Sequence, residues 1–420
     1  MTWVQSKLVR QVYPPPGRIR VLFAANLAHG LANGMLLTVL ILYFTGKVGI
    51  PAGQIGIGLT IAAALRMVVG VPAGHLLDVA GVRAGTIGFH LVQGVLIAGY
   101  ALVSGPIAFT VVASLVYMAE AGAQTGQAAL VAAAMPADER ITARAYTRSA
   151  NNVGFSVGAL IGGAALTANS QPLYIALLLV CAAMYAASGL VYVKLPAVVP
   201  VERPASAKRW EVLRDRPFAV FGLLNVVLVT NVGILLVALP LWISQKTSAP
   251  PVVYSGILLL NTIMVVLLQV RASQGAETIQ GGGRALRRCG VLLAVCCGLF
   301  ALAAGQPMWL AVVFLFAGAA VHTLSELLYS AGSWALAYEL APEHAHGQYQ
   351  GFFGMTSNLG SMVTPIVVTT LIIGSGWPGW LVLGAILLAA GLVAPSVARW
   401  AETTRASAPA AEPTTAERPA

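Results

Sequence analysis

Residues 119–136, AEAGAQTGQAALVAAAMP, and residues 325–342, SELLYSAGSWALAYELAP, share one layout. Each stretch carries a glutamate, Glu120 or Glu326, 16 residues before the proline that ends a long apolar run. A carboxylate in hydrocarbon costs about 2.5 to 3.5 kcal/mol on insertion scales, so a chain with almost no other acids in its apolar segments keeps these two for a reason. The shared spacing predicts a chain in which one half is written twice, and the two glutamates are its first candidate functional residues.

The composition around these stretches indicates a membrane protein. Of 420 residues only 9% are charged and 58% are hydrophobic, and the mean hydropathy is +0.82. Soluble domains carry about a quarter charged residues. Apolar runs of about 20 residues or more span a bilayer as helices, because a helix satisfies its own backbone hydrogen bonds. The sequence therefore predicts a polytopic membrane protein.

Glycines, prolines and charge clusters divide the chain into twelve expected spans. The expected fold is an all-α membrane protein with twelve transmembrane helices in two pseudo-symmetric six-helix bundles. The expected spans are 19–44, 52–77, 84–104, 107–134, 144–167, 172–194, 217–243, 252–271, 285–304, 308–338, 348–373 and 377–399. The expected parts are a cytoplasmic segment at 1–18, a bundle at 19–194, a polar linker at 195–216, a bundle at 217–400 and a disordered tail at 401–420.

Lysines and arginines predict the orientation of these spans. With the N-terminus placed inside, 21 of the 24 basic residues fall in inside segments, whereas the outside loops hold only Lys47 and Lys246. This bias predicts that both termini are cytoplasmic and that the protein lies in the inner (plasma) membrane. The net charge of +10 is then explained by topology and by contact with anionic lipid, and no nucleic-acid partner is expected.

One basic residue is assigned to the interior of a span. Arg140, Arg144 and Arg148, at the start of the fifth span, are counted with the inside segment, which leaves Arg66 as the only intramembrane cation. Such a cation needs a carboxylate, and Glu120 of the same half is the candidate partner. Snorkelling to the interface, or binding of an anionic substrate, is the alternative.

The four cysteines all fall in expected spans. There thiols usually pack as small apolar groups, so no disulfide framework is expected. The four are Cys181, Cys289, Cys296 and Cys297.

The repeat extends well beyond the glutamates. At offsets of 206 and 199 residues, identical or similar residues recur in both halves, including Pro136/Pro342, Asn152/Asn358, Gly154/Gly360, Asn26/Asn225, Gly34/Gly233, Lys47/Lys246 and Asp78/Glu277. Two halves of equal orientation pack around an axis along the membrane normal, and transporter sites lie near the midplane between such repeats.

The loop after the second span, GHLLDVAGVR at 74–83, resembles the signature G-x-L-x-D-x-x-G-x-[RK] of the major facilitator superfamily. Its position between the second and third spans and the twelve-span repeat extend the resemblance across the chain. The resemblance implies a charge latch that holds the cytoplasmic side closed; the alternative is a loop that only sets topology and caps a helix. The implied gate residues are Gly74, Asp78, Gly81 and Arg83, with Glu277 and Arg284 as remnants in the second half.

A glycine series in the fifth span is similar to that of the drug/proton antiporters, the multidrug efflux branch of the superfamily. Gly154, Gly158, Gly162 and Gly163 form the series, although Ala159 stands where that branch carries a proline. The resemblance implies export. Generic close packing of helices through small residues is the alternative.

Enzyme and ATP-driven functions are not indicated. Ser156 lies in a G-x-S-x-G pattern, but in the middle of a span and without the strand that a nucleophile elbow needs. His344 and His346 occupy a short turn and are interpreted as latch residues, so no metal site is expected. No G-x-x-x-x-G-K-[ST] loop occurs. We expect a non-enzyme that uses a proton gradient and no cofactor.

The two glutamate helices each present a polar face. Spacings of three and four place Glu120 and Glu326 on faces shared with other polar side chains, and His322 precedes Glu326 by one turn. A carboxyl in a low-dielectric cavity can load and release protons as access alternates. The expected proton-coupling residues are Glu326, Glu120, His322 and Arg66. The alternative for each glutamate is a structural carboxyl that ties helices together, and for His322 a packing histidine.

The remaining polar residues of the spans predict a neutral, polar and aromatic cavity. Such a lining suits a moderately lipophilic compound with several hydrogen-bonding groups, and a cationic one if the two glutamates dominate the field. The alternative for the asparagines of the spans is that they form hydrogen bonds between helices and do not line a cavity. The expected lining is Asn26, His29, Asn33, Tyr117, Gln124, Asn225, Asn231, Tyr329, Trp334 and Asn358.

Together these patterns predict a secondary active transporter that exports small hydrophobic or amphiphilic compounds by proton-coupled alternating access. Its expected partners are a small-molecule substrate and the lipid bilayer, and a monomer is expected. A proton symporter importing a polar metabolite is the alternative. A non-transporting receptor or scaffold is the alternative of another class, which the short loops disfavour.

Overall fold

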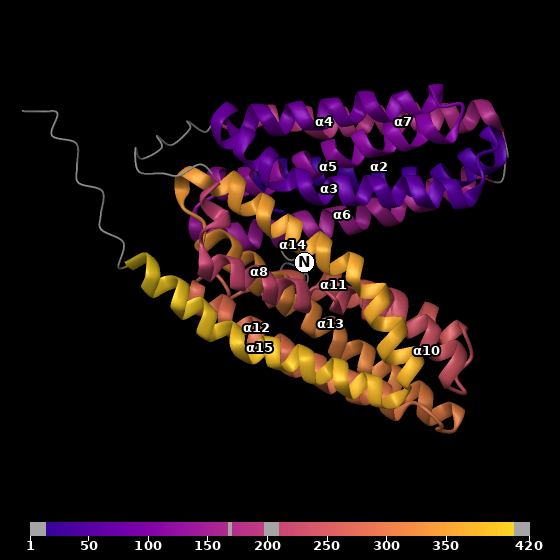
Figure 1. Cartoon of the computed structure of the whole chain (residues 1–420), viewed down its shortest axis with the longest axis vertical. Coiled ribbons are helices and arrows are strands. Elements are labelled where there is room, and N and C mark those ends of the chain that lie inside the picture. The colour runs from indigo at the N-terminus through magenta and orange to yellow at the C-terminus, as the bar shows by residue number, and fades with distance from the viewer. Residues whose placement is uncertain (1–13, 167–169, 197–209, 407–420) are drawn as a thin grey trace, which may run out of the picture.

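The computed structural model describes residues 14–166, 170–196 and 210–406. Over these ranges the chain is built from helices and contains no strand. The helices form two bundles that lie side by side, α2 to α7 from the first half and α8 to α15 from the second (Figure 1). This confirms the predicted all-α architecture.

The first bundle consists of six long helices and three short terminal turns. Its elements are α2 (Arg18–Tyr43), η1 (Phe44–Val48), α3 (Ala52–Ala80), α4 (Val82–Gly99), η2 (Tyr100–Leu102), α5 (Pro106–Ala134), α6 (Ala137–Leu166), α7 (Gln171–Val191) and η3 (Tyr192–Lys194).

The second bundle repeats this layout after a short turn. Its elements are η4 (Glu211–Leu213), α8 (Arg216–Leu228), α9 (Asn231–Gly233), η5 (Ile234–Ala238), α10 (Leu239–Lys246), α11 (Val252–Ser273), α12 (Ile279–Leu302), α13 (Met308–Glu339), η6 (Glu343–Ala345), α14 (His346–Val367), η7 (Val368–Gly374) and α15 (Trp377–Ala406).

Within the described residues, eleven helical segments are long and apolar enough to cross a membrane, and α6 is the twelfth long helix. The fifth span was expected to begin at residue 144, but α6 begins at Ala137. Pro136 precedes the helix, and Asp138 and Glu139 lie in its first turn, where acids stabilise a helix N-terminus. Arg144 and Arg148, which stand at the start of the expected span but were counted with the inside segment before it, therefore lie well inside the helix.

The seventh span is broken near its middle. Residues 229–230 interrupt the helical pattern between α8 and α9, and a π-helical turn follows at Ile234–Ala238. Such irregular backbone at membrane depth is tolerated only inside protein or beside a cavity. Asn231 at the break is fully buried.

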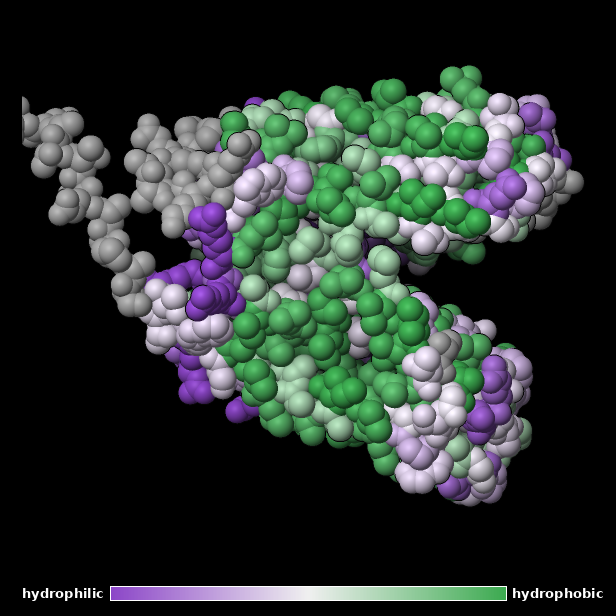
Figure 2. All heavy atoms as spheres, viewed as in Figure 1, coloured by the Kyte–Doolittle hydropathy of each residue, from purple (hydrophilic) through white to green (hydrophobic). Residues whose placement is uncertain are grey.

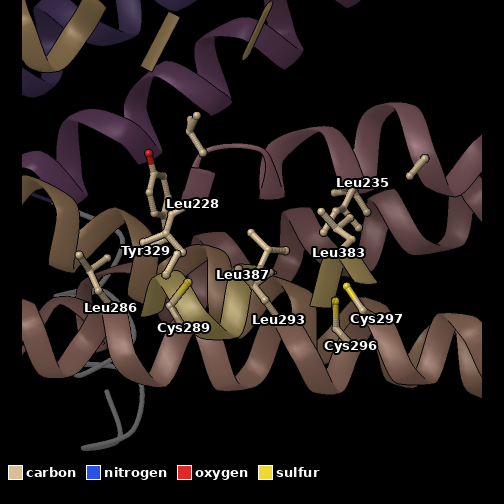
Figure 3. Close-up of a cluster of buried hydrophobic side chains, with 14 of the residues drawn as sticks. Leu228, Leu235, Leu286, Cys289, Leu293, Cys296, Cys297, Tyr329, Leu383 and Leu387 are labelled. Atoms are coloured by element: carbon tan, nitrogen blue, oxygen red, sulfur yellow. The ribbon is translucent and has the colours of Figure 1, made fainter. Parts of the chain in front are cut away.

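The core of the second bundle contains three of the four cysteines. Figure 3 shows Cys289, Cys296 and Cys297 among leucines of α12 and α15, and all three thiols are free. Cys181 is also buried and free in α7. The prediction that the cysteines pack as small apolar groups is confirmed.

The two bundles touch at one end and separate at the other. We call the end that holds residues 195–196, residues 210–215 and the end of α15 the linker end, and the opposite end the open end. Contacts between the bundles involve α3, α5 and α6 of the first half and α11, α13 and α14 of the second. Figure 2 shows a wedge-shaped notch between the bundles that widens toward the open end.

Candidate functional site

The central feature of the site is an ion pair that joins the two halves. Glu326 on α13 accepts a hydrogen bond from the guanidinium of Arg148 on α6. Its other carboxylate oxygen accepts from Asn261 Nδ2 on α11 at 3.0 Å. The Glu326 side chain is only 14% exposed, so the pair sits in a poorly hydrated region where removing one partner would strand a charge.

His322 lies one turn before Glu326 and is buried. Its Nε2 lies 2.9 Å from the backbone carbonyl oxygen of Asn231, which can only accept, so Nε2 carries the proton. The histidine thus satisfies a carbonyl at the break in the seventh span. Its Nδ1 is buried and has no hydrogen-bond partner among the described residues.

Glu120 has an equivalent place in the first half but a different partner. Its carboxylate lies 3.3 Å from the guanidinium of Arg66 on α3 and accepts from Gln124 Nε2 at 3.0 Å. Gln124 in turn accepts from Arg66 at 2.8 Å, which closes a triangle. The expected pairing of Arg66 with Glu120 is present, and it lies wholly within one half.

The two glutamates therefore differ in what their charges hold together. In the first half Arg66 of α3 neutralises Glu120, whereas the residue that α11 offers to Glu326 is the neutral Asn261. Glu326 consequently takes its cation from α6 of the opposite half. Only this second pair must break if the halves move apart at that point.

A central cavity of about 380 Å³ lies between the halves beside this ion pair. The cavity is lined mostly by neutral polar and aromatic side chains, as the sequence predicted, but also by two arginines. The predicted residues that line it are Asn26, His29, Gln124, Tyr329, Trp334 and Asn358.

Arg144 is the cavity residue that the sequence analysis placed wrongly. Its guanidinium carbon lies 3.6 Å from the centroid of the Trp334 ring, a cation–π stack between α6 and α13. Arg148 lines the same cavity. Both arginines had been counted with the inside segment, as topogenic charges.

Four predicted lining residues lie elsewhere. Asn225 is buried. Its Oδ1 accepts a hydrogen bond from the Tyr329 hydroxyl at 2.8 Å, and its Nδ2 donates one to the Ser357 hydroxyl at 2.9 Å. Asn231 is buried at the helix break, Asn33 is half-buried, and Tyr117 packs 5.9 Å from the Arg66 guanidinium. None of the four lines the central cavity. Asn225 ties helices together, as the alternative interpretation held.

The charge of the cavity also differs from the expectation. The glutamates were expected to dominate the field and to favour a cation. Each is paired with an arginine, and the charged side chains that line the central cavity are Arg144 and Arg148. The local charge is therefore positive.

A second cavity of about 540 Å³ adjoins the first between α6, the broken seventh span, α11 and α13. Its lining is mostly apolar and includes Val153, Phe155, Leu236 and Val265, with Glu326 at one side. Arg148 and Val232 line both cavities, so the two are neighbours.

The linker end is closed by the loop that resembles the superfamily signature. Asp78 accepts from the backbone N–H groups of Gly347 at 2.7 Å and Gln348 at 3.1 Å, in the first turn of α14. A Cβ at Gly74 would collide with the Gly347 carbonyl, and a Cβ at Gly351 with the Gly70 carbonyl. Helices α3 and α14 therefore cross in backbone contact, and Asp78 meets a helix N-terminus of the other half.

The other signature residues do not join the halves. Arg83 donates to the Leu195 carbonyl at 2.6 Å within its own half, and Gly81 ends α3 with a φ of 93°. Arg284 is exposed and bonds its own helix, and the hydrogen bonds and ion pairs of the described residues include none for Glu277. An ion pair at 3.6 Å between Arg140 and Glu339 joins the halves there instead.

The glycine series of α6 serves helix packing. A Cβ at Gly154, Gly158 or Gly162 would meet backbone or side-chain atoms of α2, whereas Gly163 faces open space. Three of the four glycines thus seat α6 on α2 and leave its opposite face, with Arg148, toward the second half.

Sequence reasoning missed Arg144, Arg148 and Asn261. A signal for the arginines existed, because four-residue spacing from Arg140 places all three on one face of a helix. Asn261 was also visible, since it interrupts the apolar run ILLLNTIMVVLL at 257–268.

Comparisons with known proteins agree with this architecture. The human organic anion transporter MFSD10 (TETRAN) superposes with a TM-score of 0.70 at 16% identity, covering 91% of this chain and 100% of that one. The E. coli fucose:proton symporter FucP gives 0.69 at 14% identity, covering 91% and 98%. A bacterial homologue of the iron transporter ferroportin, in an outward-facing state, gives 0.68 at 16% identity, covering 92% and 100%.

A search of curated protein sequences returned no match. The sequence profile of the Major Facilitator Superfamily, however, matches residues 22–326, which is well over half of the chain. The chain belongs to the Major Facilitator Superfamily, and it is therefore a multi-pass membrane transporter.

Proposed function

We propose that this transporter exports small amphiphilic compounds in exchange for protons, and that Glu326 is the proton-coupling residue. The observation that carries the proposal is the Glu326–Arg148 pair, because it joins the two halves and is broken when the carboxylate takes a proton. Glu120 is paired within one half and is proposed to be structural.

The coupling step follows from the geometry of the pair. With Glu326 ionised, Arg148 holds α6 against α13 and the linker end stays closed. A proton on Glu326 removes the attraction, so the pair no longer opposes separation of the halves at the linker end. Asn261 keeps the carboxyl in place meanwhile through its hydrogen bond.

The proposed orientation places the linker end in the cytoplasm. It rests on the bias of lysines and arginines toward that side. The structure then corresponds to a state open to the outside, in which an exporter has released its substrate and accepts a proton. The similar outward-facing structure of the ferroportin homologue is compatible with such a state.

The proposal is tested in everted membrane vesicles with an acidified interior and a fluorescent pH indicator. A panel of amphiphilic compounds is added, and a transported compound should release protons from the vesicles in the wild type. We expect Glu326→Gln to abolish this release. Glu120→Gln is the matched control and should keep it, because its ion pair does not cross between the halves.

Two results would refute parts of the proposal. Proton release by Glu326→Gln at the wild-type rate would show that the proton site lies elsewhere. Uptake of protons together with the compound, in the same direction, would replace export by symport.

A further inference from the structure

Charge on the cavity walls is not balanced. The two neighbouring cavities are lined by two arginines and one carboxylate, namely Arg144, Arg148 and Glu326. Glu326 forms an ion pair with Arg148. Arg144 is left without an acid. Among the described residues its guanidinium takes part in no ion pair or side-chain hydrogen bond, and it stacks on the face of Trp334.

The stack on Trp334 orients this guanidinium. An arginine that lies flat on an aromatic ring keeps its N–H donors at the edge, in the plane of the fork. With the ring 3.6 Å from the guanidinium carbon, one face is covered and the edge remains for a partner in the central cavity. Carboxylate, sulfonate and phosphate groups are the partners that fit a guanidinium fork.

The adjoining cavity is suited to the apolar part of a substrate. It is the larger of the two, it is lined by apolar side chains such as Phe155 and Leu236, and it meets the central cavity at Val232. A molecule that fills both cavities would carry a polar head beside Arg144 and an apolar body beside α6 and α11.

We propose that the substrate of this transporter is an amphiphilic organic anion whose anionic group binds Arg144 over Trp334 and whose apolar part lies in the second cavity. The inference rests on the proposed function for its assumption that these cavities are the transport site. It replaces the cationic substrate that the glutamates alone suggested.

Equilibrium binding tests the inference without requiring transport. The probe is radiolabelled 2-naphthalenesulfonate, added to the purified full-length protein in lipid nanodiscs. Its competitors are 2-naphthoate, 2-naphthylmethanol and 2-naphthylmethylammonium, which share the ring and differ in charge. We expect saturable binding of the sulfonate, competition by the carboxylate, and competition by the alcohol and the cation weaker by about tenfold or more.

Variants separate the role of Arg144 from loss of fold. Arg144→Gln should weaken sulfonate binding by about tenfold and abolish the preference for anions, whereas Arg144→Lys should keep the preference. Arg287→Gln, which removes an exposed positive charge on α12, is the control and should bind as the wild type does. Size-exclusion profiles confirm that each variant is folded.

Absence of saturable sulfonate binding to the wild type would overturn the inference, as would a wild-type preference for the ammonium. An anion preference that survives in Arg144→Gln would also overturn it. These outcomes are independent of proton coupling: a protein that binds the anions but shows no proton exchange in vesicles would refute the proposed function alone.

Discussion

Glu120 and Glu326 occupy equivalent positions of two repeated halves, yet their surroundings give them different physical roles. Arg66 completes a closed triangle with Glu120 and Gln124 inside the first half. Glu326 instead depends on a cation supplied across the interface. The two carboxylates are placed symmetrically, but their cations are not. The Arg66–Glu120 pair therefore stabilises one half, whereas the Arg148–Glu326 pair joins the two halves.

The energetic coupling of Arg148 and Glu326 can be measured by a double-mutant cycle. Removing one partner of a buried pair costs about 3 to 5 kcal/mol because the other charge is stranded. We expect Arg148→Gln and Glu326→Gln each to lower the unfolding temperature in detergent, and the double variant to lower it by much less than the sum.

The pair Arg140–Glu339 is the matched control for that cycle. Its charged atoms are 3.6 Å apart, too far for a hydrogen bond, so a weaker coupling than that of Arg148 and Glu326 is expected. Additive effects at Arg148 and Glu326 would mean that the cross-interface contact contributes nothing to stability.

Sequence alone identified the glutamates because an acid in an apolar run is costly, but it could not identify their partners. Arg66 was found as an intramembrane cation, whereas Arg148 was counted with the inside segment. The reason is physical: a helix that faces a polar cavity tolerates arginines on its inner face, so charge no longer marks the end of a span. Partner choice across an interface depends on packing that a repeat pattern does not contain.

At the scale of elements, the crossing of α3 and α14 is the closure of the linker end. Glycines on both helices allow backbone contact, and the N-terminus of α14 presents its N–H groups to Asp78. The resemblance of the signature loop implied a charge latch at this place. It did not predict that Arg83 would bind the Leu195 carbonyl of its own half.

A bulky side chain at Gly74 should prevent this closure. In Gly74→Val the new side chain would collide with the Gly347 carbonyl, so the open end should close more often. The measurement is labelling of Asn358→Cys in the cavity by a membrane-impermeant maleimide added at the open end; the native cysteines are buried. A shift of about 1.4 kcal/mol in the conformational equilibrium would lower labelling by up to about tenfold.

Gly88→Val in α4 provides the control for Gly74→Val. A Cβ at Gly88 meets no atom within 4 Å, so labelling should match that of the parent protein. Equal labelling in both glycine variants would show that the α3–α14 crossing does not set the equilibrium.

For the whole molecule, the sequence predicted the architecture well because composition and repeats act over many residues. Twelve long helices in two bundles follow from hydropathy. The start of α6, the break in the seventh span and the continuation of α15 to Ala406, into the expected tail, were not foreseen. The break could not be foreseen because the prolines of this span, Pro217 and Pro240, lie away from Asn231, and because the ring of His322 on another helix supports the Asn231 carbonyl.

The charge balance of the two cavities predicts how the whole transporter responds to voltage. Exchange of one proton inward for one organic anion outward moves two charges in the same electrical sense. A potential of 100 mV contributes about 2.3 kcal/mol per charge, so transport of 2-naphthalenesulfonate should accelerate when the cytoplasmic side is negative.

Proteoliposomes with a potassium gradient and valinomycin provide this measurement. The same vesicles without valinomycin are the control. A rate that does not change with potential would contradict one-for-one exchange of a proton and an anion, and would instead fit electroneutral symport.

The central claim is that protonation of Glu326 releases Arg148 and lets the halves separate at the linker end. Spin-label distances between Ala80→Cys and Gln274→Cys at the linker end, and between Gln54→Cys and Val252→Cys at the open end, follow both movements; all four sites are exposed. As the pH is lowered, the linker-end distance should lengthen and the open-end distance shorten, and Glu326→Gln should show the low-pH distances at every pH. Distances that are independent of pH in the wild type, or a Glu326→Gln variant that still responds to pH as the wild type does, would contradict the account.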